Sequence, residues 1–275
     1  MRIICDTASL FKPEDEVKYG IRVLPLNVTI NNETYQELKE IDLKTFIQKI
    51  YDGGIPSSSQ PSVGIVMEVF EESDEEILAI TMADGLSGTY QTFEGVAQSM
   101  ERDNIHVLNS RTLCGPEYLL VHKAIRLKNE GRNLNEILDE LNYSMDHHAS
   151  FLIPSDFEFL KRGGRLSPLA ATLGGFMKIV PVLKESDDGK ILEKFAIKKT
   201  FKGAVNDIIQ YFHNMNIDKD YTVYVTHADA LDKADMAKNL IKESFPDTTI
   251  EIKELTPVFT TQGGPGCVAI QVIHN

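Results

Sequence analysis

Two short segments of the chain concentrate hydroxyl side chains among small residues. Residues 57–62 read Ser-Ser-Ser-Gln-Pro-Ser, and residues 85–90 read Gly-Leu-Ser-Gly-Thr-Tyr. Each comes just before a helical pattern, so backbone amides at a helix start lie near the hydroxyls. Such amides and hydroxyls together can bind an anion without a charged side chain. We take both segments as candidate anion sites; the simpler alternative is that Ser62, Ser87 and Thr89 only cap helices.

Ser87 raises a second possibility, that of a hydrolase nucleophile. Gly85 and Ser87 fit the start of the G-x-S-x-G nucleophile elbow, but Thr89 stands where the last glycine should be. His227 and Asp229 could complete a triad, although no spacing selects them. A serine hydrolase acting on a lipid-like ester through Ser87 therefore stays as an alternative hypothesis.

Other chemistries lack their residues. The chain contains neither G-x-G-x-x-G nor G-x-x-x-x-G-K-[ST], the patterns that hold nucleotide phosphates. Its cysteines (Cys5, Cys114 and Cys267) are far apart and show no C-x-x-C spacing, and the adjacent rings of His147 and His148 point apart. We expect no metal, no cofactor and no disulfide.

Charge and hydropathy limit the partners. The formal net charge is −13, from 41 acidic and 28 basic residues, so a nucleic-acid surface is not expected. No run of 18 apolar residues occurs, and the first residues do not resemble a secretory signal. We expect a cytoplasmic protein without integral membrane insertion.

The hydroxyl-rich segments sit within an alternation of strand and helix patterns. In the first half, strands are expected at residues 2–6, 21–30, 76–82 and 105–108, and helices after Asp42, after Ser62, and at 89–100, 118–129 and 134–145. Such interleaving predicts a mostly parallel sheet with helices on both faces. Ligands of such sheets bind at the carboxyl ends of the strands, where both segments fall.

From about residue 150 the pattern changes. Short helices are expected at 156–160 and 168–173, an antiparallel hairpin at 178–183 and 191–199 around Gly189, and then helices at 204–215 and 233–244 among strands at 151–153, 221–226, 249–255 and 267–273. The predicted fold is α/β: an N-terminal mostly parallel α/β domain, residues 1–150, and a C-terminal α+β domain, residues 151–275.

Several of these segments, taken in order, resemble the DegV family, which includes the fatty-acid-binding (FakB-type) subunits of bacterial fatty acid kinase. The similar segments are residues 6–10 (DTASL), 58–62 (SSQPS), 86–91 (LSGTYQ), 159–167 (FLKRGGRLS) and 178–183 (KIVPVL) with Asp188-Gly189. Each is weak alone, but five in order along nearly the whole chain are specific.

The resemblance implies a hydrophobic tunnel between two domains that holds one long-chain fatty acid. Carried over by position, the carboxylate would be bound by Ser58, Ser87, Gly88 and Gln262. Arg165 would face a separate ATP-dependent fatty acid kinase, and Lys198 and Lys199 would lie in a basic stretch linked to phosphoryl transfer to form an acyl phosphate. The chain itself would supply no catalytic residue. A third hypothesis is a binding module for another ligand.

Two positions depart from the family pattern. Gln262 stands where relatives have histidine, so the site loses a possible counter-ion and desolvation should raise the pKa of a bound carboxylate. Lys198-Lys199 stands where arginine is usual, and lysine lacks the bidentate fork. Because a C16 chain gains on the order of 11 kcal/mol by burial and one hydrogen bond nets about 1 kcal/mol, affinity should survive both changes.

Overall fold

The computed structural model describes residues 1–168 and 179–275. Its first sheet is parallel, with strand order β2-β1-β6-β7. These strands are β1 (Arg2–Asp6), β2 (Ile21–Leu24), β6 (Ile77–Thr81) and β7 (Ile105–Asn109). Every residue of β6 is buried, as expected for an apolar strand covered on both faces. The predicted parallel α/β region is confirmed.

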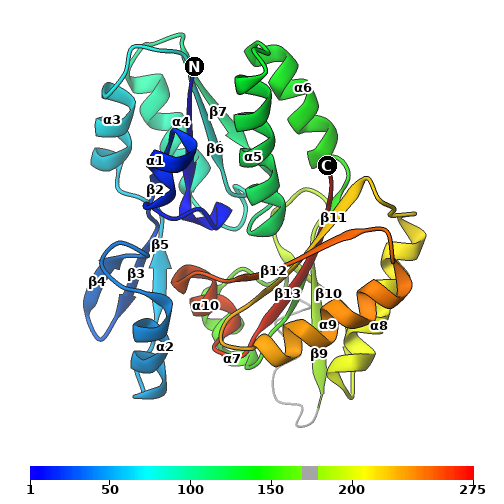
Figure 1. Ribbon diagram of the computed structural model, residues 1–275. Helices are drawn as coiled ribbons and strands as arrows, with labels where there is room; N and C mark the ends of the chain where they lie inside the picture. The colour runs from blue at the N-terminus through cyan, green and yellow to red at the C-terminus, as the bar shows by residue number, and fades with distance from the viewer. Residues whose placement is uncertain (169–178) are drawn as a thin grey trace.

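Helices cover both faces of this sheet (Figure 1). On one face Ile4 of β1 packs with α3 (Val63–Glu71) and α4 (Thr89–Ser99). On the other, Ile3 and Cys5 pack with α5 (Gly115–Asn129) and α6 (Leu134–Met145). Alternate residues of a strand point to opposite faces, and both sets are apolar here, so the strand pattern requires a helix layer on each side.

The expected strand over residues 21–30 is wrong, because two strands occupy this span. Pro25 follows β2, and the chain then starts β3 (Asn27–Ile30) in a different sheet. A proline lacks the amide that a continuous central strand would need. β3 pairs antiparallel with β4 (Glu33–Gln36) through a turn at Asn31 and Asn32, both at positive φ, and with β5 (Ser57–Ser59).

β5 differs from the sequence pattern, because the serines, glutamine and prolines of residues 56–61 are typical of a polar loop. The small sheet β4-β3-β5 and α2 (Leu43–Tyr51) form a unit beside the parallel sheet (Figure 1). As predicted, the side chains of Asp42 and Ser62 cap α2 and α3.

The larger sheet is mixed, with strand order β10-β9-β8-β13-β11-β12. Its strands are β8 (His148–Ile153), β9 (Val180–Glu185), β10 (Leu192–Lys198), β11 (Tyr221–His227), β12 (Thr249–Glu254) and β13 (Val268–His274). β9 and β10 form the predicted antiparallel hairpin, with Gly189 at φ 70° in its turn. Only β11 and β12 pair in parallel, which confirms a sheet-rich second region separate from the first.

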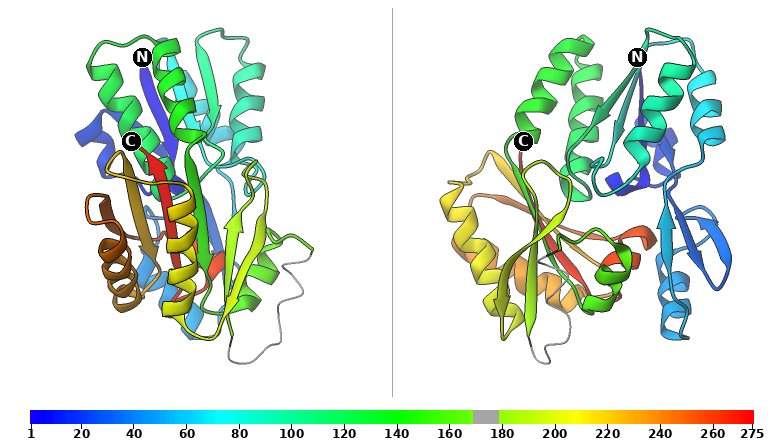
Figure 2. Two further views of the ribbon diagram at one scale, coloured as in Figure 1. Left: turned by 90° about the vertical axis from the view of Figure 1, so that its right-hand side faces the viewer. Right: turned by 180° about the vertical axis from the view of Figure 1, so that it is seen from behind.

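The two faces of the larger sheet meet different surroundings. One is apolar and packs on α8 (Phe201–Asn214) and α9 (Leu231–Ser244). The other faces the parallel-sheet region, from which α5 packs against β11 and β13. The side view in Figure 2 shows both regions lying closely one above the other. No flexible linker separates them, because β8 begins only three residues after α6 ends.

Smaller helices complete the described chain: η1 (Thr7–Ser9), α1 (Asp15–Tyr19), α7 (Phe157–Gly163) and α10 (Pro257–Gly263). The sequence pattern does not predict α10, which lies between the strands expected at 249–255 and 267–273. α10 packs against α7 and also against α2, β3 and β5. The helix expected at residues 168–173 lies almost wholly outside the described residues.

Candidate functional site

A cavity lies where the parallel sheet, the small sheet and the larger sheet meet. Its empty space measures about 910 Å³, counting the part open to solvent. The cavity is lined by the segments that follow the carboxyl ends of three parallel strands. Leu26 comes after β2, Met82, Leu86 and Ser87 come after β6, and Leu113 and Cys114 come after β7. The site therefore occupies the edge of the sheet that the sequence predicted.

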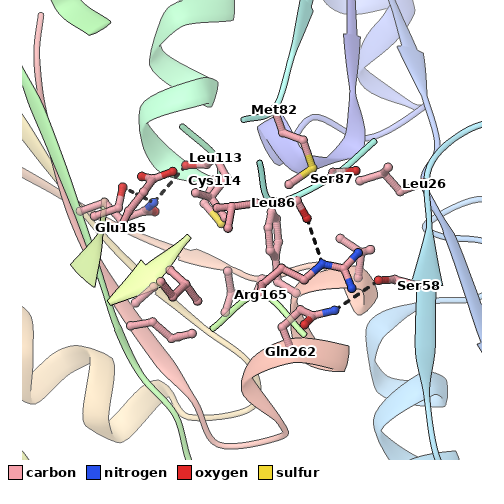
Figure 3. A pocket seen from close by; sticks show the side chains of 18 of the residues that line it. Leu26, Ser58, Met82, Leu86, Ser87, Leu113, Cys114, Arg165, Glu185 and Gln262 are labelled. Atoms are coloured by element: carbon pink, nitrogen blue, oxygen red, sulfur yellow. Dashed lines mark hydrogen bonds between the residues drawn. The ribbon is translucent and has the colours of Figure 1, made fainter. Parts of the chain in front are cut away.

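Most of the cavity wall is apolar. The apolar lining residues include Leu26, Leu86 and Leu113 in the loops, Val258 and Phe259 of α10, and Leu152 and Ala269 of the larger sheet. Polar groups gather at two ends, which Figure 3 separates clearly: Ser58, Ser87, Arg165 and Gln262 on one side and Glu185 on the other. An apolar space with polar groups at its ends suits an amphipathic ligand. We call the end formed by Ser58, Ser87, Arg165 and Gln262 the entrance, because these four residues are partly exposed whereas Glu185 is buried.

Ser58 and Gln262 lie together at the entrance. Nε2 of Gln262 donates to Oγ of Ser58 over 3.3 Å and to Oγ1 of Thr261 over 3.1 Å. Both amide protons are thus engaged within the protein. Because Ser58 Oγ accepts from Gln262, the Ser58 hydroxyl proton is left to donate into the cavity. In this arrangement Gln262 orients Ser58 rather than contacting a ligand anion through Nε2 itself.

Gly163, at the end of α7, makes this position of Gln262 possible. A Cβ at Gly163 would lie 1.8 Å from Oε1 of Gln262. A larger residue would push the amide away from Ser58. The glycine of the 159–167 segment thus serves close approach, which the spacing alone did not reveal.

Ser87 is held in a similar way. Its Oγ lies 2.8 Å from Oγ1 of Thr89 and accepts from the Thr89 amide over 3.3 Å. Gly88 is the residue preceding α4 and has no side chain to cap it, while a Cβ there would crowd the Gln60 amide at 3.1 Å. If Thr89 donates to Ser87, the Ser87 proton also points to a ligand. Ser62, by contrast, caps α3, so the capping alternative holds for that residue.

Arg165 places a positive charge at the same entrance. Its Nε donates to the Leu86 carbonyl over 3.1 Å, and its Nη1 donates to the Gly163 carbonyl. These bonds tie the segment after α7 to the loop that carries Ser87. The entrance therefore contains a cation although position 262 is a neutral glutamine.

Lys198 and Lys199 are not part of this cluster. Leu192, at the start of β10, is the residue of this strand that lines the cavity. Lys198 and Lys199 lie at the other end of the strand, about 20 Å from Leu192. Lys198 pairs with Asp207 of α8 over 2.7 Å, and Lys199 is exposed. The structure brings Ser58, Ser87, Gln262 and Arg165 together, with Gly88 directly behind Ser87, and leaves both lysines apart.

The hydrolase alternative finds no triad. Among the described residues, Ser87 has no histidine partner, and Nδ1 of His227 accepts from the Ala230 amide over 3.2 Å. His227 is buried and does not line the cavity, so it cannot take a proton from Ser87.

Two buried carboxyl groups support the cavity from behind. Asp6 accepts from the amides of Ala8 (2.8 Å) and Met82 (3.1 Å), which fixes the chain after β6. Glu37 accepts from Oγ1 of Thr7 (2.5 Å) and from the Val258 amide at the start of α10 (2.8 Å). Burial raises the pKa of each to about 7, although these hydrogen bonds oppose the rise.

The sequence reasoning missed the other polar end. Ser150, Glu185 and Gln271 line it. Only Gln271 falls within an expected strand, since the sequence predicts strands at 151–153 and 178–183 that stop short of Ser150 and Glu185. Polar residues inside otherwise apolar strands, such as Gln271 in VAIQVIH, were the available signal.

No described helix is both long and apolar enough to cross a bilayer. Within residues 1–168 and 179–275, no three His, Cys, Asp or Glu side chains are grouped so that they could hold a metal ion.

Fold and cavity together define a class: an α/β protein with two packed regions and an apolar ligand cavity between them, entered past hydroxyls and an arginine. The family described as "Uncharacterised protein, DegV family" matches residues 1–275. The chain belongs to the DegV family. One relative, the DegV domain-containing protein BH3627 of Halalkalibacterium halodurans, is 28% identical over 98% of this chain and 96% of its own.

Solved structures share the fold along their whole length. A fatty-acid-binding DegV family protein from Thermus thermophilus has a TM-score of 0.88 and 26% identity, with 100% of both chains covered. DegV of Bacillus subtilis, described as a fatty acid binding protein, has a TM-score of 0.86 and 25% identity, with 100% of this chain and 99% of that chain covered.

Proposed function

We propose that this protein binds one long-chain fatty acid in the cavity, with the carboxylate at the entrance. The observation that carries the proposal is the cavity's composition, apolar along its length with two serine hydroxyls and one guanidinium at one end. Burying a C16 chain gains on the order of 11 kcal/mol before the costs of binding, so the apolar wall sets affinity. The entrance groups set which end of the ligand they meet.

The carboxylate would accept a hydrogen bond from the Ser58 hydroxyl, and another from the Ser87 hydroxyl when Thr89 is the donor in the Ser87–Thr89 pair. Gln262 would hold Ser58 in place, and Gly88 would keep the backbone before α4 unobstructed. Arg165 would supply the charge that Gln262 lacks. The rise in the ligand's pKa that desolvation alone would cause is then opposed by a nearby cation.

We further propose that the loaded protein presents its carboxylate to a separate ATP-dependent fatty acid kinase, which forms the acyl phosphate. Arg165 supports this extension because it lies at the entrance, where a transferred phosphoryl group would arrive. Lys198 and Lys199 would contribute only as an outlying contact surface for the kinase, given their distance along β10. On this proposal the protein is a cytoplasmic lipid-binding accessory protein, and the units 1–150 and 151–275 act together as the two walls of its cavity.

The first experiment is native mass spectrometry of the purified protein, followed by solvent extraction and identification of bound lipid. A single fatty acid at one-to-one stoichiometry is expected. Protein that is empty and also refuses added palmitate and oleate would contradict the proposal and favour a binding module for another ligand.

The kinase step is tested separately, by ATP-dependent acyl phosphate formation on the loaded protein with a fatty acid kinase added. Arg165→Ala should reduce the rate strongly, and Lys198→Ala or Lys199→Ala weakly. Loaded protein that no kinase accepts would overturn the presentation step and leave fatty-acid binding standing.

A further inference from the structure

The inner end of the cavity carries a carboxyl group without hydrogen-bond partners among the described residues. Glu185, the last residue of β9, is 3% exposed, and neither of its side-chain oxygens accepts a hydrogen bond from the described chain. It nonetheless lines the cavity. A buried carboxyl that accepts no hydrogen bond is unfavourable, so a group that donates to it would be bound with a gain in affinity.

The strand register places Glu185 in a polar row. Phe151 pairs with Lys184, so the next residues, Ser150 and Glu185, lie side by side on the opposite face. Ser150 in turn pairs with Gln271 of β13. This face of the larger sheet looks toward the cavity, whereas Phe151 points to the apolar core on α8.

Gln271 is already satisfied and Glu185 is not. Oε1 of Gln271 accepts from the Gly115 amide (3.2 Å), and its Nε2 donates to the Leu113 carbonyl (3.0 Å) and to Ser150 Oγ (3.1 Å). These bonds hold the row rigid. The imidazole of His148 lies beside Glu185, with Nε2 3.7 Å from Oε2, which is too long for a hydrogen bond. The buried carboxyl of Glu117 is also close enough to interact electrostatically with Glu185, and burial and this interaction both raise the pKa of Glu117.

The imidazole of His148 is itself largely buried beside Glu185. Burial lowers the pKa of His148, but the adjacent Glu185 carboxylate and the Met145 carbonyl raise it, and the net shift is upward. A histidinium beside it stabilises the carboxylate as an acceptor. The inner end is thus arranged to accept a hydrogen bond from a donor group that lies in the cavity.

We propose that the cavity prefers an acyl ligand that carries a hydroxyl group far from its carboxylate, and that Glu185 binds this hydroxyl. The proposal rests on the proposed fatty-acid-binding function and adds its specificity. An unsubstituted chain would place methylenes against the Glu185 carboxyl and satisfy neither oxygen. A hydroxy fatty acid would be held at both polar ends, by Ser58, Ser87 and Arg165 at the entrance and by Glu185 at the other.

The test is competition against a fluorescent fatty acid by palmitate, by ω-hydroxypalmitate and by hydroxypalmitates substituted near the middle of the chain. We expect one hydroxylated acid to bind about tenfold tighter than palmitate, the gain typical of a hydrogen bond to a charged group. Glu185→Leu should reverse this preference, and the near-isosteric Glu185→Gln should reduce it. Glu193→Gln, an exposed change on the same hairpin, should leave it unchanged.

Each outcome decides a different point. If the unmodified protein binds palmitate as tightly as every hydroxylated acid, the inference is overturned and fatty-acid binding stands. A preference that persists in both Glu185 variants would remove Glu185 from the explanation and overturn it as well. If no acid binds at all, the proposed function fails first. Should Glu185→Leu not fold, the unmodified protein and Glu185→Gln still decide.

Discussion

At the scale of single residues, the entrance depends on hydrogen bonds that leave the right protons available. The side-chain amide of Gln262 donates both of its protons, one to Ser58 and one to Thr261, so its effect on a ligand is indirect. Arg165 lies beside it with a permanent charge. A neutral residue at position 262 therefore does not leave the entrance without a cation, which the sequence comparison of that position alone had suggested.

The two serines should contribute separately to binding of the carboxylate. We expect Ser58→Ala and Ser87→Ala each to weaken palmitate binding by roughly tenfold, because each removes one hydrogen bond to a charged group. Ser57→Ala, an exposed change on the same short strand, is the matched control. Isothermal calorimetry or competition measures the affinities; unchanged affinity in both variants would place the carboxylate elsewhere.

The buried carboxyl of Glu37 should make stability depend on pH. Its pKa is about 7 in the folded protein and near ~4 in an unfolded chain, so between these values the folded state holds more protons. The contribution of Glu37 to the free energy of unfolding should therefore fall as pH rises from about 4 to about 7 and then level off. Asp6 acts in the same direction.

Urea unfolding at several pH values across this window checks the effect. Glu37→Gln should reduce the slope, although it also destabilises the protein by losing one of the bonds to Thr7 or Val258. An identical slope in the variant would show that Glu37 does not titrate in this range.

At the scale of elements, periodicity predicted most helices and strands, and the exceptions have physical causes. The run 21–30 is mostly apolar, and Pro25 marks the point where the chain passes from one sheet to another. α10 was missed because its seven residues are too few to show a helical period. Its position depends on distant contacts, including the bond from the Val258 amide to Glu37.

The contact between α5 and β11 should tolerate no added methyl group. A Cβ at Gly115 would lie 2.2 Å from Cγ of Tyr224, so Gly115→Ala should destabilise the protein by about 1–3 kcal/mol. Gly95→Ala is the matched control, because Gly95 is exposed within α4 and a Cβ there meets nothing within 4 Å. That change should stabilise by up to ~1 kcal/mol. Equal effects in thermal or urea unfolding would contradict the close contact.

At the scale of the whole molecule, the cavity is a junction that none of the sheets forms alone. The turn of the β9–β10 hairpin packs against the parallel-sheet region, since a Cβ at Gly85 would lie 2.2 Å from Cα of Lys190. A ligand in the cavity touches both regions and α10 together. Ligand binding should therefore stabilise the packing of the two regions against each other, and not only the fold of one region.

Fatty acid should raise the unfolding temperature with ligand concentration, because it binds only the folded chain. At 100 times the dissociation constant the gain is about 2.7 kcal/mol. Delipidation should lower the unfolding temperature, and added palmitate should restore it. Methyl palmitate, which lacks the anionic carboxylate, should restore it less; equal recovery would show that the entrance groups do not bind the carboxylate.

The sequence by itself determined the fold class. It also predicted the edge of the parallel sheet at which the cavity lies, carboxylate-binding roles for Ser58, Ser87 and Gln262, and a kinase-facing role for Arg165. These follow from local period, from strand-end loops and from resemblance, all of which can be read along the chain. Only the tertiary structure showed that Lys198 and Lys199 lie apart from the cluster of Ser58, Ser87, Gln262 and Arg165. It alone also placed Glu185 at the inner end of the cavity. Such placements depend on the register between β8 and β9 and on the packing of segments that are distant in the sequence. Neither can be predicted from a local stretch of residues.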